Sequence, residues 1–204
     1  MNKATRTAAS TLGVYAGLLA IEHGAFEILQ GSVRPAALLI NAIGPPCQME
    51  TAWHACFPAL TLIPNFLVSG IVAVIIGLIL VTWAAVFIQR KRGGLILIVL
   101  SMLALLVGGG FVPVFISIIA GVAATRIHAP LGQKRRPLLA ALWPWPLVVL
   151  AVWAPGAWLL GHFFNQFMLD VGFVFFLCFD FGLPLLIVFS ARAHDILVAM
   201  RDDN

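Results

Sequence analysis

Long apolar runs, broken by short polar connections, recur along the whole chain. Several exceed the roughly 17 residues that a helix needs to cross a bilayer. The alternation of period two that a membrane β-barrel requires does not occur in the sequence. The pattern therefore predicts an all-α integral membrane protein, a bundle of six transmembrane helices that forms a single domain over residues 1–204. The spans are predicted at about residues 8–30, 65–88, 94–108, 111–126, 146–164 and 167–190.

The third and fourth spans rest on the interpretation of residues 93–126, which form either one broken span or two short spans. The run Gly108–Gly110, with Pro113 nearby, interrupts a helix and favours a turn. Two short spans also place the basic clusters at residues 90–92 and 126–136 on the same side of the membrane. The positive-inside rule requires that arrangement, so we predict two short spans.

Composition and charge agree with this topology. The chain is 62% hydrophobic and 10% charged, whereas a soluble domain has about 25% charged residues. Six spans place all of the 12 basic residues except Arg34 on the cytoplasmic side. We therefore expect an integral protein of a cytoplasmic membrane, inner or plasma, with the N-terminus and the C-terminus both inside. The net charge of +4 lies in short connections, so nucleic acid is not an expected partner.

The outer segment, residues 31–64, joins the first two spans. Residues 48–60 are apolar enough to form a short interfacial helix that caps a pocket, but a packed surface loop is the favoured interpretation. Cys47 and Cys56 both fall in this segment, outside the cell, where disulfide bonds persist. We predict a bond between them, with a pair of buried free thiols as the alternative.

Ionisable side chains gather in the first predicted span. At about 100° per residue, Tyr15, Glu22, His23, Glu27 and Gln30 share an arc of about 140° on one face of the helix. An ionisable group costs roughly 2.5–3.5 kcal/mol at the centre of a membrane-spanning helix, so these residues are expected to be paired or to have a function.

The predicted topology brings further polar residues to the same outer end. His162, Asn165 and Asp170 come from the ends of the fifth and sixth spans. Together with Glu22, His23, Glu27 and Gln30 they predict an outward-facing ligand or ion pocket. The alternative is structural, with the carboxylates paired to Arg34 and hydrogen-bonded between helices.

The sequence does not identify the ligand of this pocket. His23, Glu27 and His162 are the residue types that bind zinc, iron or manganese, so a divalent metal ion is a weak prediction. No spacing in the chain matches a defined metal motif. Haem held by His23 and His162 is the least favoured option.

Asp180 lies near the middle of the predicted sixth span, four residues before Pro184. Proline cannot donate a hydrogen bond to the Asp180 carbonyl, so the helix should kink there. An intramembrane aspartate beside a broken turn suits a proton relay, separate from the outer pocket. A hydrogen bond from Asp180 to Tyr15 or to a neighbouring hydroxyl is the structural alternative.

These observations favour a small transporter or channel, coupled to protons or cations. The alternative from another class is an accessory or assembly subunit of a larger membrane complex. An intramembrane enzyme acting on a lipid or a quinone ranks third, because no nucleophile motif supports it. The expected partners are the lipid bilayer and either a second copy of the chain or a membrane-complex subunit.

Overall fold

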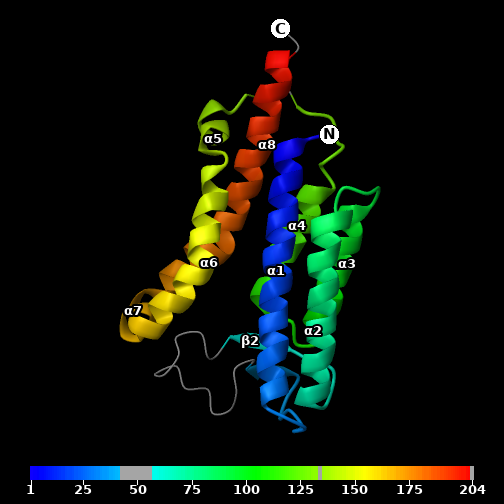
Figure 1. Ribbon diagram of the computed structural model, residues 1–204, viewed down its shortest axis with the longest axis vertical. Helices are drawn as coiled ribbons and strands as arrows, with labels where there is room; N and C mark the ends of the chain where they lie inside the picture. The colour runs from blue at the N-terminus through cyan, green and yellow to red at the C-terminus, as the bar shows by residue number, and fades with distance from the viewer. Residues whose placement is uncertain (42–56, 133–134, 203–204) are drawn as a thin grey trace.

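A computed structural model describes residues 1–41, 57–132 and 135–202. Helices dominate, and they stand side by side as an elongated bundle (Figure 1). In chain order the elements are α1 (Lys3–Leu29), β1 (Leu39–Asn41), β2 (Pro58–Leu60), α2 (Phe66–Thr82), the π-helical η1 (Trp83–Phe87), α3 (Gly93–Leu106), α4 (Phe111–Ala124), α5 (Pro137–Leu142), α6 (Trp145–Phe163), α7 (Asn165–Phe175), the π-helical η2 (Phe176–Gly182) and α8 (Leu183–Asp202).

Within the described ranges, four helical segments are long and apolar enough to cross a membrane. They are Lys3–Leu29, Phe66–Phe87, Trp145–Phe163 and Leu177–Arg201. The first three match predicted spans one, two and five within a few residues, except that α1 begins about one turn earlier. The fourth candidate, Leu177–Arg201, overlaps the predicted sixth span and extends beyond its predicted end at residue 190.

The break predicted at Gly108–Gly110 is present, with α3 ending at Leu106 and α4 beginning at Phe111. Each helix has 14 residues. At 1.5 Å per residue each is about 21 Å long, shorter than the roughly 30 Å hydrocarbon core of a bilayer. The alternative of an interfacial helix over residues 48–60 does not hold at its end, because Pro58–Leu60 forms a strand. This strand pairs antiparallel with Leu39–Asn41, and residues 48–56 lie outside the described residues.

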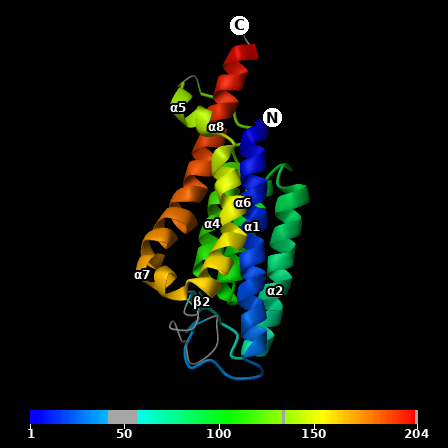
Figure 2. The ribbon, with the colours of Figure 1, turned by 60° about the vertical axis from the view of Figure 1, so that its left-hand side comes forward.

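Glycines bring α1 and α2 into backbone contact. A Cβ at Gly24 would lie 2.7 Å from the carbonyl oxygen of Gly70, and one at Gly17 would lie 3.0 Å from that of Gly77. The two pairs are seven residues apart on each helix and face each other in antiparallel order. Small residues let membrane helices approach closely, and α2 therefore packs along α1 over most of its length (Figures 1 and 2).

The α3–α4 hairpin is held in the same manner. A Cβ at Gly94 on α3 would meet the amide nitrogen of Thr125 at 2.7 Å, so the start of α3 lies directly against the end of α4. Midway along the hairpin, the hydroxyls of Ser101 and Ser117 form a buried hydrogen bond of 2.6 Å. At its tip, Gly108 donates its N–H to the Leu60 carbonyl at 2.8 Å, which ties the turn to β2.

The start of α1 and the end of α8 lie at the same end of the molecule (Figure 1). The Asn2 side chain forms no cap for α1, and Asp195 from α8 caps the helix in its place. The carboxylate accepts the backbone N–H groups of Ala4 at 3.0 Å and Thr5 at 2.8 Å, and the Thr5 hydroxyl at 2.6 Å. A buried anion at a helix N-terminus also interacts favourably with the helix dipole.

We expect Asp195→Asn to lower the free energy of unfolding by about 1–2 kcal/mol. The amide keeps one acceptor oxygen, but its NH2 group replaces the second oxygen and faces the donors at the start of α1. Titration with SDS in mixed micelles measures this change. Asp170→Asn is the matched control, since Asp170 is exposed on α7 and should change stability by less than about 0.5 kcal/mol. An equal loss in the two variants would contradict the capping role.

Candidate functional site

A small cavity lies between α1, α4, α6 and η2. Its polar lining consists of Tyr15, Glu22 and His23 from α1 and Asp180 from η2. Its volume is about 70 Å³, which is room for a few water molecules. Drug-sized ligands occupy pockets of about 300–1,000 Å³, so this cavity suits water, a proton or a small ion.

Asp180 reaches the cavity from a π-helical stretch, Phe176–Gly182. At the end of this stretch, Leu183 donates its N–H to the Cys178 carbonyl, five residues earlier. Pro184 follows directly and has no N–H to continue a regular α-helix. The kink predicted between Asp180 and Pro184 is therefore a widened, π-helical turn. Such turns occur frequently at functional sites.

Aromatic rings hold the π-helical stretch against α6. The Trp153 ring stacks on Phe179 at 4.0 Å between centroids, and Phe175 stacks on Phe179 at 5.5 Å. Phe181 contacts Phe115 of α4 at 4.4 Å. Asp180 thus lies between rings that pack in two directions, which fixes its backbone beside the cavity.

Tyr15 lies within electrostatic range of both Asp180 and Glu22. We predicted that Asp180 is separate from the outer pocket that contains Glu22 and His23. The structure corrects this, because Asp180 lines the same cavity as Glu22 and His23. The helical face predicted for Tyr15, Glu22 and His23 agrees with their common position on this cavity.

His23 links the cavity to the tip of the α3–α4 hairpin. Its ring is nearly buried, and Nδ1 lies 3.0 Å from the Leu19 carbonyl oxygen. On its other side, a Cβ at Gly110 would lie 2.5 Å from His23 Nε2. Gly110 has a φ of 79°, so this turn needs glycine both for its backbone and for the space that the imidazole occupies.

Glu27 lies one helical turn beyond His23 and is 0% exposed. Its carboxyl group lies against the Cα of Gly108, where a Cβ would overlap it. Ser69 of α2 approaches the carboxyl, but its hydroxyl is bonded to the Val107 carbonyl at 3.1 Å and to the Thr61 hydroxyl at 2.6 Å. Neither oxygen of Glu27 forms a well-aligned hydrogen bond. Glu27 therefore does not form the ion pair with Arg34 that the structural alternative required.

The other predicted pocket residues do not line this cavity. Gln30 follows the last turn of α1, and its amide reaches the Asn41 carbonyl at 3.4 Å. His162 is exposed near the end of α6, and Asn165 begins α7. Asp170 is exposed and accepts a hydrogen bond from Gln166 at 3.2 Å. The α6–α7 end leans away from the lower half of α1 (Figure 1), and none of His162, Asn165 and Asp170 is among the residues that line the cavity.

The metal ligands predicted from sequence are likewise not assembled. Across the described ranges, no three His, Cys, Asp or Glu side chains come close enough together to hold a metal ion. His162 is not among the residues that line the cavity beside His23, so the axial pair considered for haem is not assembled there. The predicted Cys47–Cys56 bond lies outside the described residues.

Sequence reasoning missed two parts of the site. One is the glycine turn of the α3–α4 hairpin as the partner surface of His23 and Glu27. In the sequence, Gly108 and Gly110 indicate a turn, but they do not indicate which helix packs against that turn. The other is Trp153, whose position on α6 opposite Asp180 depends on how α6 crosses α8.

The chain matches no known family model, and comparison with curated proteins and solved structures gives no match.

Proposed function

We propose that this protein is a small membrane transporter or channel that moves protons or small cations. The observation that carries the proposal is the cavity lined by Tyr15, Glu22, His23 and Asp180. Titratable side chains on separate helices, around a space for a few waters, are what a proton or ion path requires. The small volume argues against a bulky substrate.

The proposed route runs along α1. Asp180 and Glu22 face the cavity, His23 lies between the cavity and the hairpin turn, and Glu27 lies one turn farther toward the β1–β2 end. Carboxylic acids and an imidazole can pass a proton through intervening water. Asp170, which we predicted in the outward-facing pocket, is left out of the route because it is exposed on α7.

The proposed topology has six membrane crossings, with α3 and α4 as a short pair, and both chain ends in the cytoplasm. Support comes from the position of the α2–α3 and α4–α5 connections at the same end as the start of α1 (Figure 1). These connections carry most of the basic residues, and the positive-inside rule assigns such an end to the cytoplasm.

Flux measurements on the purified chain in proteoliposomes test the proposal. A pH-sensitive dye in the lumen reports proton entry after a pH gradient or a potassium diffusion potential is applied. We expect Asp180→Asn to lower proton flux by at least about tenfold, because an amide cannot carry a proton through the membrane interior. Asp170→Asn is the matched control and should retain the flux of the wild type.

Unchanged flux in Asp180→Asn would remove Asp180 from the mechanism, and an equal loss in Asp170→Asn would show that the effect is not local to the cavity. Wild-type protein with no proton or sodium flux under either driving force would overturn the transport function. The accessory-subunit alternative predicts that last result.

A further inference from the structure

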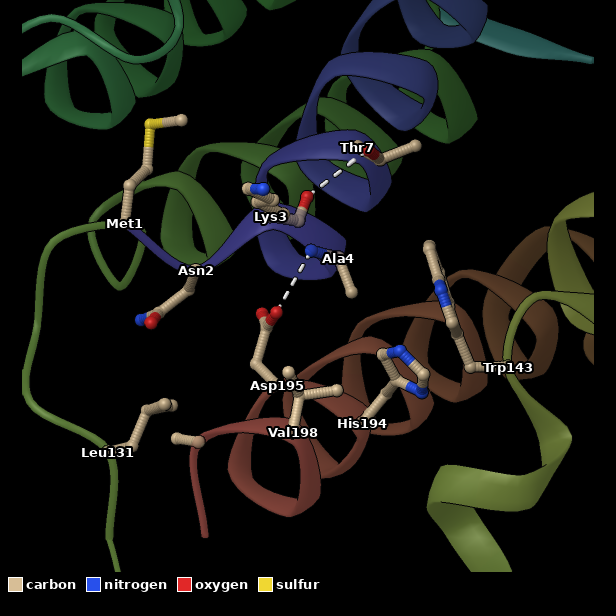
Figure 3. A pocket seen from close by; sticks show the side chains of 11 residues that line it. Met1, Asn2, Lys3, Ala4, Thr7, Leu131, Trp143, His194, Asp195 and Val198 are labelled. Carbon is tan, nitrogen blue, oxygen red and sulfur yellow. Dashed lines mark hydrogen bonds between the residues drawn. The ribbon is translucent and has the colours of Figure 1, made fainter. Parts of the chain in front are cut away.

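A second and larger cavity lies at the end of the bundle where the chain begins and ends. It is formed by the start of α1, the last turns of α8 and the end of α5 (Figure 3). Its volume is about 500 Å³. Lys3 and Thr7 line it from α1, Trp143 from the end of α5, and His194, Asp195 and Val198 from α8. None of these residues belongs to the proposed proton or cation path.

The polar groups that remain available in this cavity are mainly donors. Asp195 is already bonded to three donors at the start of α1, so its charge is largely compensated. Lys3 contributes an ammonium group from an exposed position, and His194 contributes ring nitrogens. His194 and Trp143 lie together on one side of the cavity, with ring centroids 6.4 Å apart, and Lys3 lies on the α1 side (Figure 3).

The cavity also borders apolar surface. Helix α5 packs on α8 and ends at Trp143, and its Leu138 side chain is 85% exposed. Leu142 and Trp145, on either side of Trp143 in the chain, are also exposed. Tryptophan favours the headgroup level of a membrane, and leucine side chains around it favour acyl chains. A ligand that fits both surfaces has an anionic head and an apolar tail.

We propose that this cavity binds the phosphate-bearing headgroup of an anionic phospholipid, with its acyl chains along the exposed leucines of α5. Lys3 would supply the positive charge, and His194 and Trp143 would donate N–H groups to phosphate or glycerol oxygens. Basic pockets between membrane helices are an established type of lipid headgroup site. The site holds α1, α5 and α8 together at the membrane surface, whatever passes through the other cavity.

Native mass spectrometry of the full chain, released from detergent that contains phosphatidylglycerol or phosphatidylcholine, tests the proposal. The test variant is the double substitution Lys3→Ala with His194→Ala. Its matched control is Arg6→Ala with His128→Ala, which likewise removes one basic residue and one histidine, from exposed positions at the same end but outside the cavity. Unfolding by SDS is measured for both variants, so that a loss of fold is recognised separately.

We expect the wild type and the control to retain phosphatidylglycerol in preference to phosphatidylcholine. The test variant should retain about tenfold less phosphatidylglycerol than the control. Both variants lose one exposed cation, but only the test variant loses a charge inside the cavity, worth about fivefold for anionic lipid, together with the His194 N–H donor. Equal retention by the test variant and the control, in folded protein, would overturn the site. Displacement of the lipid by soluble glycerol phosphate at similar concentration would also overturn it, since the acyl chains would then contribute nothing.

Discussion

Gly70→Ala should destabilise the protein by about 2–3 kcal/mol, a large effect for one methyl group. The new Cβ would lie 2.7 Å from the backbone nitrogen of Ile28 and closer still to the Gly24 carbonyl oxygen. Both are backbone atoms of α1, so no side chain can rotate away, and α1 and α2 would have to separate along their seam. Small residues are what allows this contact in a membrane, where no hydrophobic force drives helices together.

Gly156→Ala on α6 is the matched control, because a Cβ there would meet nothing within 4 Å. Alanine is favoured over glycine inside a helix by up to about 1 kcal/mol, so this variant should be slightly more stable than the wild type. The two substitutions are therefore expected to have opposite signs in SDS unfolding. Equal stability of Gly70→Ala and the wild type would show that α1 and α2 are not in backbone contact.

The sequence predicted the apolar helices well, because the length and hydrophobicity of a span are local properties. It was less exact at the C-terminal end of the last span, which was predicted to end at residue 190, whereas the candidate membrane helix continues to Arg201. Arg192 and Asp195 made that tail appear polar. Both are satisfied by partners far away in sequence, since Arg192 bonds to the carbonyls of Arg126 and Pro130. A hydropathy pattern cannot anticipate such partners.

The candidate site was predictable as far as one helix determines it. The positions of Tyr15, Glu22 and His23 on one face follow from the helical repeat, and all three line the cavity. The other wall depends on how the helices cross. Asp180 joined the cavity and Asp170 did not, although both belong to the stretch that we treated as one span. The π-helical turns at residues 176–182 change the direction of side chains along that stretch, which sequence periodicity does not report.

Glu27→Met should stabilise the fold and at the same time impair transport. Glu27 is fully buried, and neither carboxyl oxygen has a well-aligned hydrogen bond. A buried polar group without partners costs about 1–3 kcal/mol, and methionine fills a similar volume without that cost. We expect the free energy of unfolding in SDS to rise by about 2 kcal/mol. Proton flux in proteoliposomes should fall, because the proposed route beyond His23 would lose its carboxyl group.

Glu27→Gln separates the two contributions. Glutamine keeps the shape and leaves a buried amide against Gly108, so its stability should stay closer to that of the wild type while its flux falls as in Glu27→Met. A residue that lowers stability and supports activity is retained for its function, and this pattern would be expected of Glu27. If Glu27→Met instead destabilised the fold by 1 kcal/mol or more, Glu27 would be a structural partner between α1 and the hairpin turn. The proposed route would then end at His23.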